Sequence, residues 1–226
     1  MHNTGLIIAV LGVDGSGKST VIQTMKSALD KANHNATHVL HLRPGLLPPL
    51  ARLKGKAAIQ EGPVLEPHGA TPSGPVGSLI RLVYYTFDYI LGYWLKIRPM
   101  IVTQPTIVIF DRYAYDMALD PRRFRIGLSG CVAGWFAALA PKPDLILCLY
   151  APPEVIMARK RELPMDEIYR QVEALKAFAA QESRAVLISN SGSVDEVRTR
   201  VLQVIFDFLS RRWVGSPFAS GGVIKQ

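Results

Sequence analysis

The chain has 226 residues, of which 49% are apolar and 19% charged, so it is long enough for one soluble domain with its own core. Lysine and arginine exceed aspartate and glutamate by 26 to 18, which indicates anionic partners without separating phosphorylated metabolites, nucleic acid and membrane surfaces. No apolar run reaches the roughly 18 residues of a membrane helix, and the first residues lack the basic stretch of a signal peptide. We therefore expect no membrane partner and a cytoplasmic protein.

The first third of the chain predicts two buried strands with a helix between them. Residues 6–11, "LIIAVL", are apolar without alternation, as in a parallel strand covered on both faces. A glycine-rich stretch follows, "GVDGSGKST" at residues 12–20, and then a segment with helical spacing that ends near residues 33–35. Residues 36–42 predict the second strand.

The next segment, residues 43–78, differs from its surroundings because it contains seven prolines and six glycines. We expect an acceptor-side insertion here, a loop with at most one short helix, because structureless stretches of this length are usually functional or mobile. Residues 78–102 then predict a long helix.

The remainder alternates strands with helices. The expected strands are 106–111, 144–150 and 185–189; the expected helices are 126–140, 152–163, 165–182 and 194–212. Apolar strands without polar alternation, each followed by a helix, indicate an α/β fold with a doubly wound parallel sheet. We expect a single domain over residues 1–212 and a loose tail over 213–226.

The glycine-rich stretch matches the phosphate-binding loop pattern G-x-x-x-x-G-K-[ST]. Glycines let backbone N–H groups turn toward a phosphate, the lysine reaches the β- and γ-phosphates, and the hydroxyl after it ligates Mg²⁺. The match lies between a buried strand and an amphipathic helix, as this motif requires. The predicted nucleotide-binding residues are Gly12, Asp14, Gly15, Ser16, Gly17, Lys18, Ser19 and Thr20, with Ser19 on the metal.

Two further groups have the chemistry that a nucleotide triphosphate needs. Asp111 ends the strand 106–111, at the edge where ligands of open α/β sheets bind, so it is the leading metal or acceptor-orienting carboxylate; a capping role is the alternative. The cationic segment 158–164, "ARKRELP", predicts a short closing lid over 159–166 that carries Arg159 and Arg161. A solvated helix end would have a similar sequence.

Together these features favour a kinase for a small acceptor, because the guanine motif N-K-x-D of GTPases is absent. The stretches "GVDGSGKST", "RPG" (43–45), "FDRY" (110–113), "LYAPPEVIMARK" (149–160) and "SNSGSVDEV" (189–197) resemble the thymidylate kinases, in order, over roughly residues 5–212. The resemblance implies a three-layer P-loop kinase fold with a five-stranded parallel sheet and helices on both faces. It also implies ATP and Mg²⁺ as the phosphoryl donor and a nucleoside monophosphate as the acceptor.

By matching position, the resemblance assigns roles to single residues. Asp14 would face the acceptor sugar, while Arg43 and Arg112 would hold the acceptor phosphate. Asp111 would orient the metal-bound phosphates, and Arg159 would be the arginine with which the lid segment begins.

The base-reading positions depart from the family pattern. The long helix of the family carries F-x-A-x-R, and here "YTFDY" puts Tyr89 in place of the arginine, as a candidate for the acceptor pocket. After "DRY" the chain reads "AYDMALDPRRFRIG" instead of the family's serine and Tyr-Gln pair. Arg122, Arg123 and Arg125 then serve a more anionic or different acceptor, or form a solvated basic turn.

We carry three hypotheses. The first is transfer of the γ-phosphoryl of ATP to a nucleoside monophosphate, with dTMP the leading candidate. The second is the same chemistry on another acceptor, such as a sugar or sugar phosphate, and the third is a nucleotide-binding regulator without transfer activity. No nucleic-acid partner is expected, because the basic residues form no stripe interleaved with aromatics, and a homodimer stays open.

Overall fold

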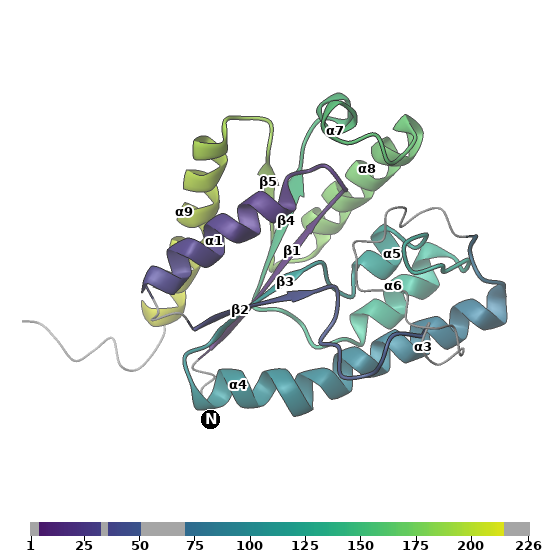
Figure 1. Ribbon diagram of the computed structural model, residues 1–226, viewed down its shortest axis with the longest axis horizontal. Coiled ribbons are helices and arrows are strands. Elements are labelled where there is room, and N and C mark those ends of the chain that lie inside the picture. Colours follow the sequence, from purple (N-terminus) through teal and green to yellow (C-terminus); the bar gives the residue numbers. More distant parts are fainter. Residues whose placement is uncertain (1–4, 33–35, 51–70, 215–226) are drawn as a thin grey trace, which may run out of the picture.

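The computed structural model describes residues 5–32, 36–50 and 71–214, and its centre is a five-stranded parallel sheet (Figure 1). The strands are β1 Leu6–Gly12, β2 Thr37–His41, β3 Ile107–Asp111, β4 Leu145–Tyr150 and β5 Ala185–Ser189. Their order across the sheet is β2-β3-β1-β4-β5, and every pairing is parallel. The five-stranded parallel sheet expected from the sequence is therefore confirmed.

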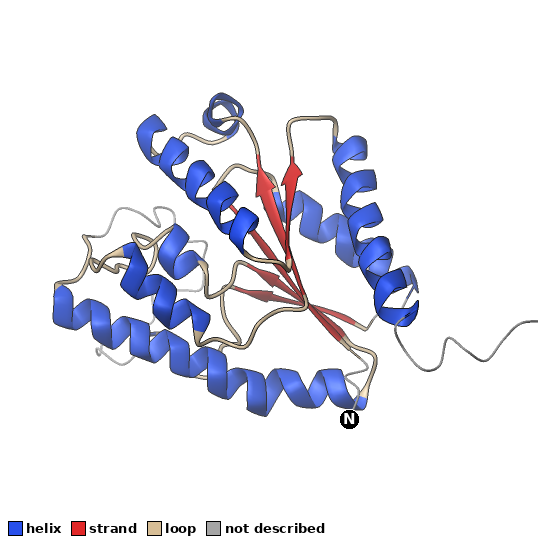
Figure 2. Cartoon of the chain, turned by 180° about the vertical axis from the view of Figure 1, so that it is seen from behind, coloured by secondary structure: helices blue, strands red, loops and turns tan. Residues whose placement is uncertain are grey.

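Helices cover both faces of this sheet. The helices α1, Lys18–Ala32, and α9, Val194–Val214, pack together on one face. The opposite layer contains α8, Met165–Gln181, and the group formed by α5, Asp116–Leu119, α6, Gly130–Ala138, and the long helix that begins at α3; the two views in Figures 1 and 2 show this separation.

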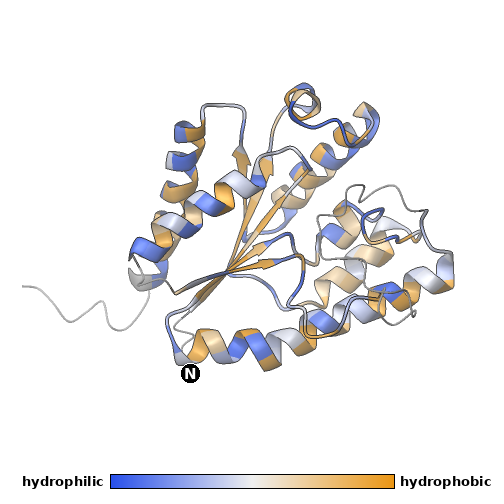
Figure 3. Ribbon diagram, in the orientation of Figure 1, coloured by the Kyte–Doolittle hydropathy of each residue, from blue (hydrophilic) through white to orange (hydrophobic). Residues whose placement is uncertain are grey.

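Side chains alternate along β1 between two apolar cores. Ile8 and Val10 pack on the side of α1 and α9, whereas Ala9 and Leu11 pack on the side of α3, α5 and α6. All four side chains are inaccessible to solvent, and Figure 3 shows the strands coloured as hydrophobic. Burial on both faces explains why these strands lack polar alternation.

The long helix predicted over residues 78–102 is present, but it begins earlier and is interrupted. It consists of α3, Pro75–Gly92, a π-helical turn η1, Tyr93–Ile97, and α4, Arg98–Thr103. The proline-rich segment therefore ends before residue 75, and residues 51–70 of that segment lie outside the described residues.

Several helix predictions need adjustment. The helix expected over 126–140 is limited to α6, and the four-residue helix α5 was not expected. The helix α7, Pro153–Arg159, ends four residues before the predicted limit, which leaves an irregular segment in front of α8. Most of the predicted loose tail lies outside the described part of the chain, and none of the helices described is long and apolar enough to cross a membrane.

The carboxylate of Asp144 connects three segments at the edge of the sheet where the strands begin. Asp144, just before β4, accepts a hydrogen bond from Ile7 N at 2.8 Å and another from Arg212 Nη1 of α9 at 2.9 Å. Arg212 Nη2 also donates to Gly5 O at 3.2 Å. The last helix is thereby fastened to the beginning of β1.

Candidate active site

The predicted phosphate-binding loop joins β1 to α1 and has a backbone that requires its glycines. A Cβ on Gly12 would lie 2.5 Å from Leu149 O and 2.7 Å from Ser16 Oγ. Gly17 has a φ of +86°, and a Cβ there would collide with the side chain of Asn190. These positions exclude side chains, which explains why the sequence gives up packing in this stretch.

Lys18 lies inside the loop rather than in solvent. Its Nζ donates hydrogen bonds of 2.8 Å to Gly12 O and to Val13 O, and the residue is 7% exposed. Burial, followed by the nearby Arg112 guanidinium, lowers the pKa of Lys18 to about 7. An arriving phosphate would bring negative charge to this lysine and favour its charged form.

Two polar atoms at the site have no hydrogen-bond partner among the described residues: Ser16 Oγ in the loop and Asp111 Oδ1 at the end of β3. The other oxygen of Asp111 is 3.2 Å from His41 Nδ1. Burial raises the pKa of Asp111, but the His41 hydrogen bond and the Lys18 charge together lower it below its ordinary value. An ionised carboxylate with one unused oxygen suits contact with a Mg²⁺ that carries the phosphates, or with one of its waters.

The residues present fit a Mg²⁺ that arrives with its nucleotide. Ser19 and Thr20 are exposed at the start of α1, which leaves their hydroxyls accessible. The described residues contain no group of three or more His, Cys, Asp or Glu side chains that could hold a metal by themselves. In nucleotide sites Mg²⁺ takes most of its ligands from phosphate oxygens and waters and only one or two from the protein.

A cavity of about 240 Å³ lies beside the loop, between α1, the end of α7 and the segment that joins β5 to α9. It is lined by Gly17, Thr20, Val21, Thr24, Arg159, Asn190, Gly192, Val194, Val197, Arg198 and Val201. Of the predicted lid arginines, Arg159 reaches this cavity and donates to Asn190 O at 3.2 Å, whereas Arg161 is exposed and does not line it.

Asn190 is a site residue that the sequence analysis did not assign. It follows β5 directly, is 9% exposed, and donates from Nδ2 to Ser16 O in the loop. Its position after the last strand, in the stretch "SNSG", was the available indication, because strand ends meet at the ligand-binding edge of such sheets.

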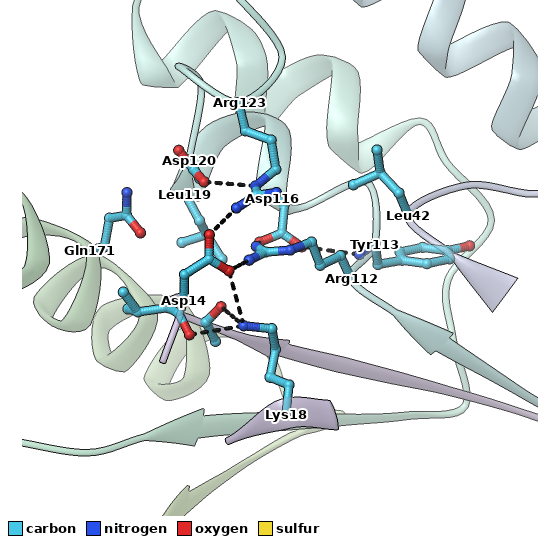
Figure 4. Close-up of polar contacts among 12 residues, drawn as sticks. Asp14, Lys18, Leu42, Arg112, Tyr113, Asp116, Leu119, Asp120, Arg123 and Gln171 are labelled. Carbon is cyan, nitrogen blue, oxygen red and sulfur yellow. Dashed lines mark hydrogen bonds and ion pairs between the residues drawn. The ribbon is translucent and has the colours of Figure 1, made fainter. Parts of the chain in front are cut away.

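On the other side of the loop, Asp14 is the centre of a group of ion pairs (Figure 4). Arg112 Nη2 and Arg123 Nη2 both donate to it, one to each oxygen, and Lys18 Nζ lies 3.7 Å from Oδ1. Burial raises the pKa of Asp14, but the charges of Arg112, Lys18, Arg123 and Lys160 outweigh it, so that the pKa falls to about 2. The loop carboxylate is therefore firmly ionised.

The backbone of Arg112 is held in a conformation that only special contacts maintain. Its φ is +75°, in the left-handed region, and its N–H donates to Val10 O at 3.0 Å. Its guanidinium is anchored by Asp116, with Nη1 at 3.3 Å from Oδ1. Such strain is concentrated at functional sites, and here it directs Arg112 toward Asp14.

For Arg123 the sequence left two roles open, a contact to a more anionic or different acceptor and a place in a solvated basic turn. Its Nε is 3.1 Å from Asp120 Oδ2, and its side chain is 14% exposed, so the interpretation as a solvated turn is wrong for this residue. Arg122 and Arg125 are exposed.

Arg43 and Tyr89 are placed away from this group. Arg43 Nη1 bonds to Asp88 Oδ2 and to Leu47 O, both at 3.1 Å, which fastens residues 43–47 to α3. Tyr89 is 1% exposed; its hydroxyl donates to Leu42 O and its ring packs against Tyr113. As a correction to the expected acceptor contact, Tyr89 belongs to the core in this structure.

Comparison with known proteins gives relatives of one kind, although no protein-family model matches the chain. The chain is 30% identical over 210 residues to a protein of Pyrobaculum aerophilum named as a probable thymidylate kinase, covering 88% of this chain and 95% of that protein. It is also 30% identical over 158 residues to the thymidylate kinase of Carboxydothermus hydrogenoformans, covering 69% of this chain and 70% of the relative.

Solved structures support the same fold at lower identity. The thymidylate kinase of Ehrlichia chaffeensis superposes with a TM-score of 0.61 at 16% identity, covering 89% of this chain and 98% of that one. The thymidylate kinase of Candida albicans gives 0.63 at 18% identity, covering 90% and 92%. With 30% identity along 95% of a curated relative, the chain belongs to the thymidylate kinase family.

Proposed function

We propose that this protein transfers the γ-phosphoryl group of ATP to a nucleoside monophosphate, with dTMP as the leading acceptor. The observation that carries the proposal is the position of the phosphate-binding loop, which lies between the cavity lined by Arg159 and Asn190 on one side and the pair Arg112 and Arg123 on the other. A donor and an anionic acceptor bound on these two sides would meet at Lys18.

The residues divide the work of the transfer. Lys18 leaves the carbonyls of Gly12 and Val13 to contact the β- and γ-phosphates, while the loop N–H groups hold the donor in place. An oxygen of the acceptor phosphate attacks the γ-phosphorus, the bond to the β–γ bridging oxygen breaks, and ADP leaves with that oxygen. Arg159, which lines the donor cavity, would face charge that develops on the donor side.

Mg²⁺ would be held by Ser19 and, directly or through water, by Asp111, and it supplies neutralisation of the phosphate charge. The unpartnered Oδ1 of Asp111 is the atom in the described structure that fits this role. The lid over 159–166 is part of the same proposal: the irregular segment between α7 and α8 would close over the donor.

The test is an ADP-release assay with MgATP and each acceptor in turn. We expect turnover with dTMP above that with dUMP and the other nucleoside monophosphates, and its loss in Asp111→Ala. Turnover with a sugar or sugar phosphate alone would establish the second hypothesis instead. ATP binding without acceptor-dependent ADP release, unchanged by Asp111→Ala, would establish the non-catalytic regulator.

We also propose a homodimer formed through α3. Its exposed apolar side chains recur at helical spacing: Val76, Leu79, Ile80, Val83, Phe87 and Leu91. A second copy packed antiparallel would cover this stripe with the same stripe, as two-fold interfaces do. Light scattering should give twice the chain mass, and Val83→Asp should return it to one chain; a monomeric wild type would exclude the dimer.

The cytoplasmic location and the lack of a nucleic-acid partner stay predictions.

A further inference from the structure

Two arginines from the same strand-end segment meet on one carboxylate of the loop. Arg112 directly follows β3, and Arg123 belongs to the turn after α5, yet both donate to Asp14, which lies about a hundred residues earlier in the chain. Each guanidinium takes a different oxygen of Asp14, as Figure 4 shows. Two guanidinium groups that converge on separate oxygens of one anion form a geometry that also suits phosphate.

Each of these arginines is held from behind by its own aspartate. Asp116 pairs with Arg112 at 3.3 Å, and Asp120 pairs with Arg123 at 3.1 Å. The side chains of both aspartates are almost fully buried, at 3% and 4% exposed. The arginines would therefore keep their direction if Asp14 moved away.

The turn that carries Arg123 has a defined backbone. Ile126 N donates to Pro121 O at 2.9 Å and Arg125 N donates to Arg122 O at 2.9 Å, with Arg125 at a φ of +55°. Ser73 N donates to Arg125 O at 3.0 Å, which connects the turn to the segment in front of α3. A left-handed residue in a turn braced on both sides fixes where Arg123 can reach.

In this arrangement each basic side chain of the group lies against an acidic one. The cations Lys18, Arg112 and Arg123 face the carboxylates Asp14, Asp116 and Asp120. The two guanidinium groups converge on Asp14, whose carboxylate occupies the space between them. An acceptor phosphate can bind here only after Asp14 has released the two arginines.

We propose that Arg112 and Arg123 form a two-arginine clamp for the phosphate of the acceptor, and that Asp14 occupies the clamp while no acceptor is bound. This inference rests on the proposed kinase function and adds Arg123, which belongs to the part of this chain that departs from the family pattern. Asp14 stands in for the acceptor phosphate: its two oxygens take the places of two phosphate oxygens. When the acceptor enters, Asp14 turns toward the sugar, and the acceptor phosphate takes its place between the two arginines.

The first test compares Arg123→Gln with the matched control Arg122→Gln, an exposed arginine of the same turn. Calorimetry would measure binding of dTMP and of thymidine, which has the same base and sugar but no phosphate. We expect Arg123→Gln to weaken dTMP binding about 10- to 100-fold, with thymidine binding unchanged. Arg122→Gln should match the wild type, and Arg123→Lys should restore part of the affinity.

A loss of thymidine binding equal to the loss of dTMP binding would assign Arg123 a purely structural role and overturn the proposal. So would unchanged dTMP binding in Arg123→Gln. Neither result affects the proposed function, which depends on turnover by the wild-type protein. If the wild type binds no nucleoside monophosphate at all, the proposed function fails, and the clamp is decided by the second test alone.

The second test uses orthophosphate as the probe and removes the occupant of the clamp. Asp14→Asn cannot compete for the two guanidinium groups as an anion, so we expect orthophosphate to bind several-fold more tightly than to the wild type. The double variant Asp14→Asn with Arg123→Gln should lose that gain. Equal orthophosphate affinity in the wild type and in Asp14→Asn would show that Asp14 does not occupy an anion site and would overturn the proposal.

Discussion

The two sides of the phosphate-binding loop are in different states. On the donor side, a cavity of about 240 Å³ lies open beside Thr20 and Arg159. On the acceptor side, Asp14 bonds to both Arg112 and Arg123 and occupies the space between them. The donor site is ready to receive a ligand, whereas the acceptor site must first give up an ion pair.

This difference follows from what builds each side. The loop is made of backbone N–H groups and glycines, whose positions do not depend on an occupant. The acceptor side is made of long charged side chains, which neutralise one another when no ligand is present.

The largest effect should come from the residue shared by both sides. Lys18→Ala should lower kcat roughly 10³-fold, because in the proposed function this lysine contacts the β- and γ-phosphates during transfer. The matched control is Lys26→Ala on the same helix, whose side chain is 45% exposed and pairs with Asp30. Acceptor-dependent ADP release measures both variants, and a Lys18→Ala enzyme within tenfold of the wild type would contradict the assignment.

Gly17→Ala should damage the donor side by geometry alone. The new methyl group meets the Asn190 side chain at a φ of +86°, so we expect a loss of roughly 2–4 kcal/mol of unfolding free energy together with weaker ATP binding. Gly45→Ala is the control, because its φ is +68° but nothing lies within 4 Å of the added carbon. It should cost about 1 kcal/mol and leave ATP binding intact.

Urea unfolding and calorimetric titration of an ATP analogue would separate the two glycine variants. Equal losses of stability would mean that strain at φ, and not the contact with Asn190, dominates at Gly17.

ATP binding should depend on pH through Lys18. Burial lowers the pKa of this lysine to about 7 in the free protein, and bound phosphates favour its charged form. Above pH 7 the free lysine has lost its proton, so binding takes one up, and affinity falls by at most about tenfold per pH unit. Below pH 7 the lysine is charged in both states, and this dependence disappears.

Titrations of an ATP analogue at pH 8.5, in buffers of different ionisation enthalpy, would detect the proton uptake. Lys18→Met should abolish it; binding at pH 8.5 without net proton uptake in the wild type would refute the expectation.

The smallest effect should come from Asn190, which supports the loop from outside. Asn190→Ala removes the hydrogen bond to Ser16 O, and we expect ATP affinity to fall about fivefold, with kcat little changed. Ser191→Ala is the control, since its hydroxyl bonds only to Ser189 in the described structure. Equal affinities of the two variants would remove Asn190 from the donor site.

The parts of the molecule that could be predicted are those with local causes. The apolar runs of β1, β3 and β4 are buried on both faces, so their residues identify them directly. The loop around Lys18 is also local, because its glycines, lysine and hydroxyls lie within nine residues of one another. Strand, loop and helix are encoded side by side there.

Contacts between distant segments could not be predicted in the same way. The pair of Asp14 and Arg123 joins a loop to a turn that has no regular pattern of its own. Tyr89 was expected in the acceptor pocket because it stands where the family pattern F-x-A-x-R has its arginine. In the structure its hydroxyl donates to Leu42 O and its ring packs in the core against Tyr113. The orientation of one side chain on a long helix depends on which neighbours the fold supplies.

Asp144, which holds both Ile7 N and Arg212, has a consequence for the loop at the far end of β1. The strand β1, whose beginning is bonded to α9, ends at Gly12 of the phosphate-binding loop. Shortening α9 by its final turn would remove Arg212, and with it the hydrogen bonds to Asp144 and to Gly5 O at the start of β1. Loss of this turn should therefore reduce the order of the phosphate-binding loop, because β1 leads directly into that loop.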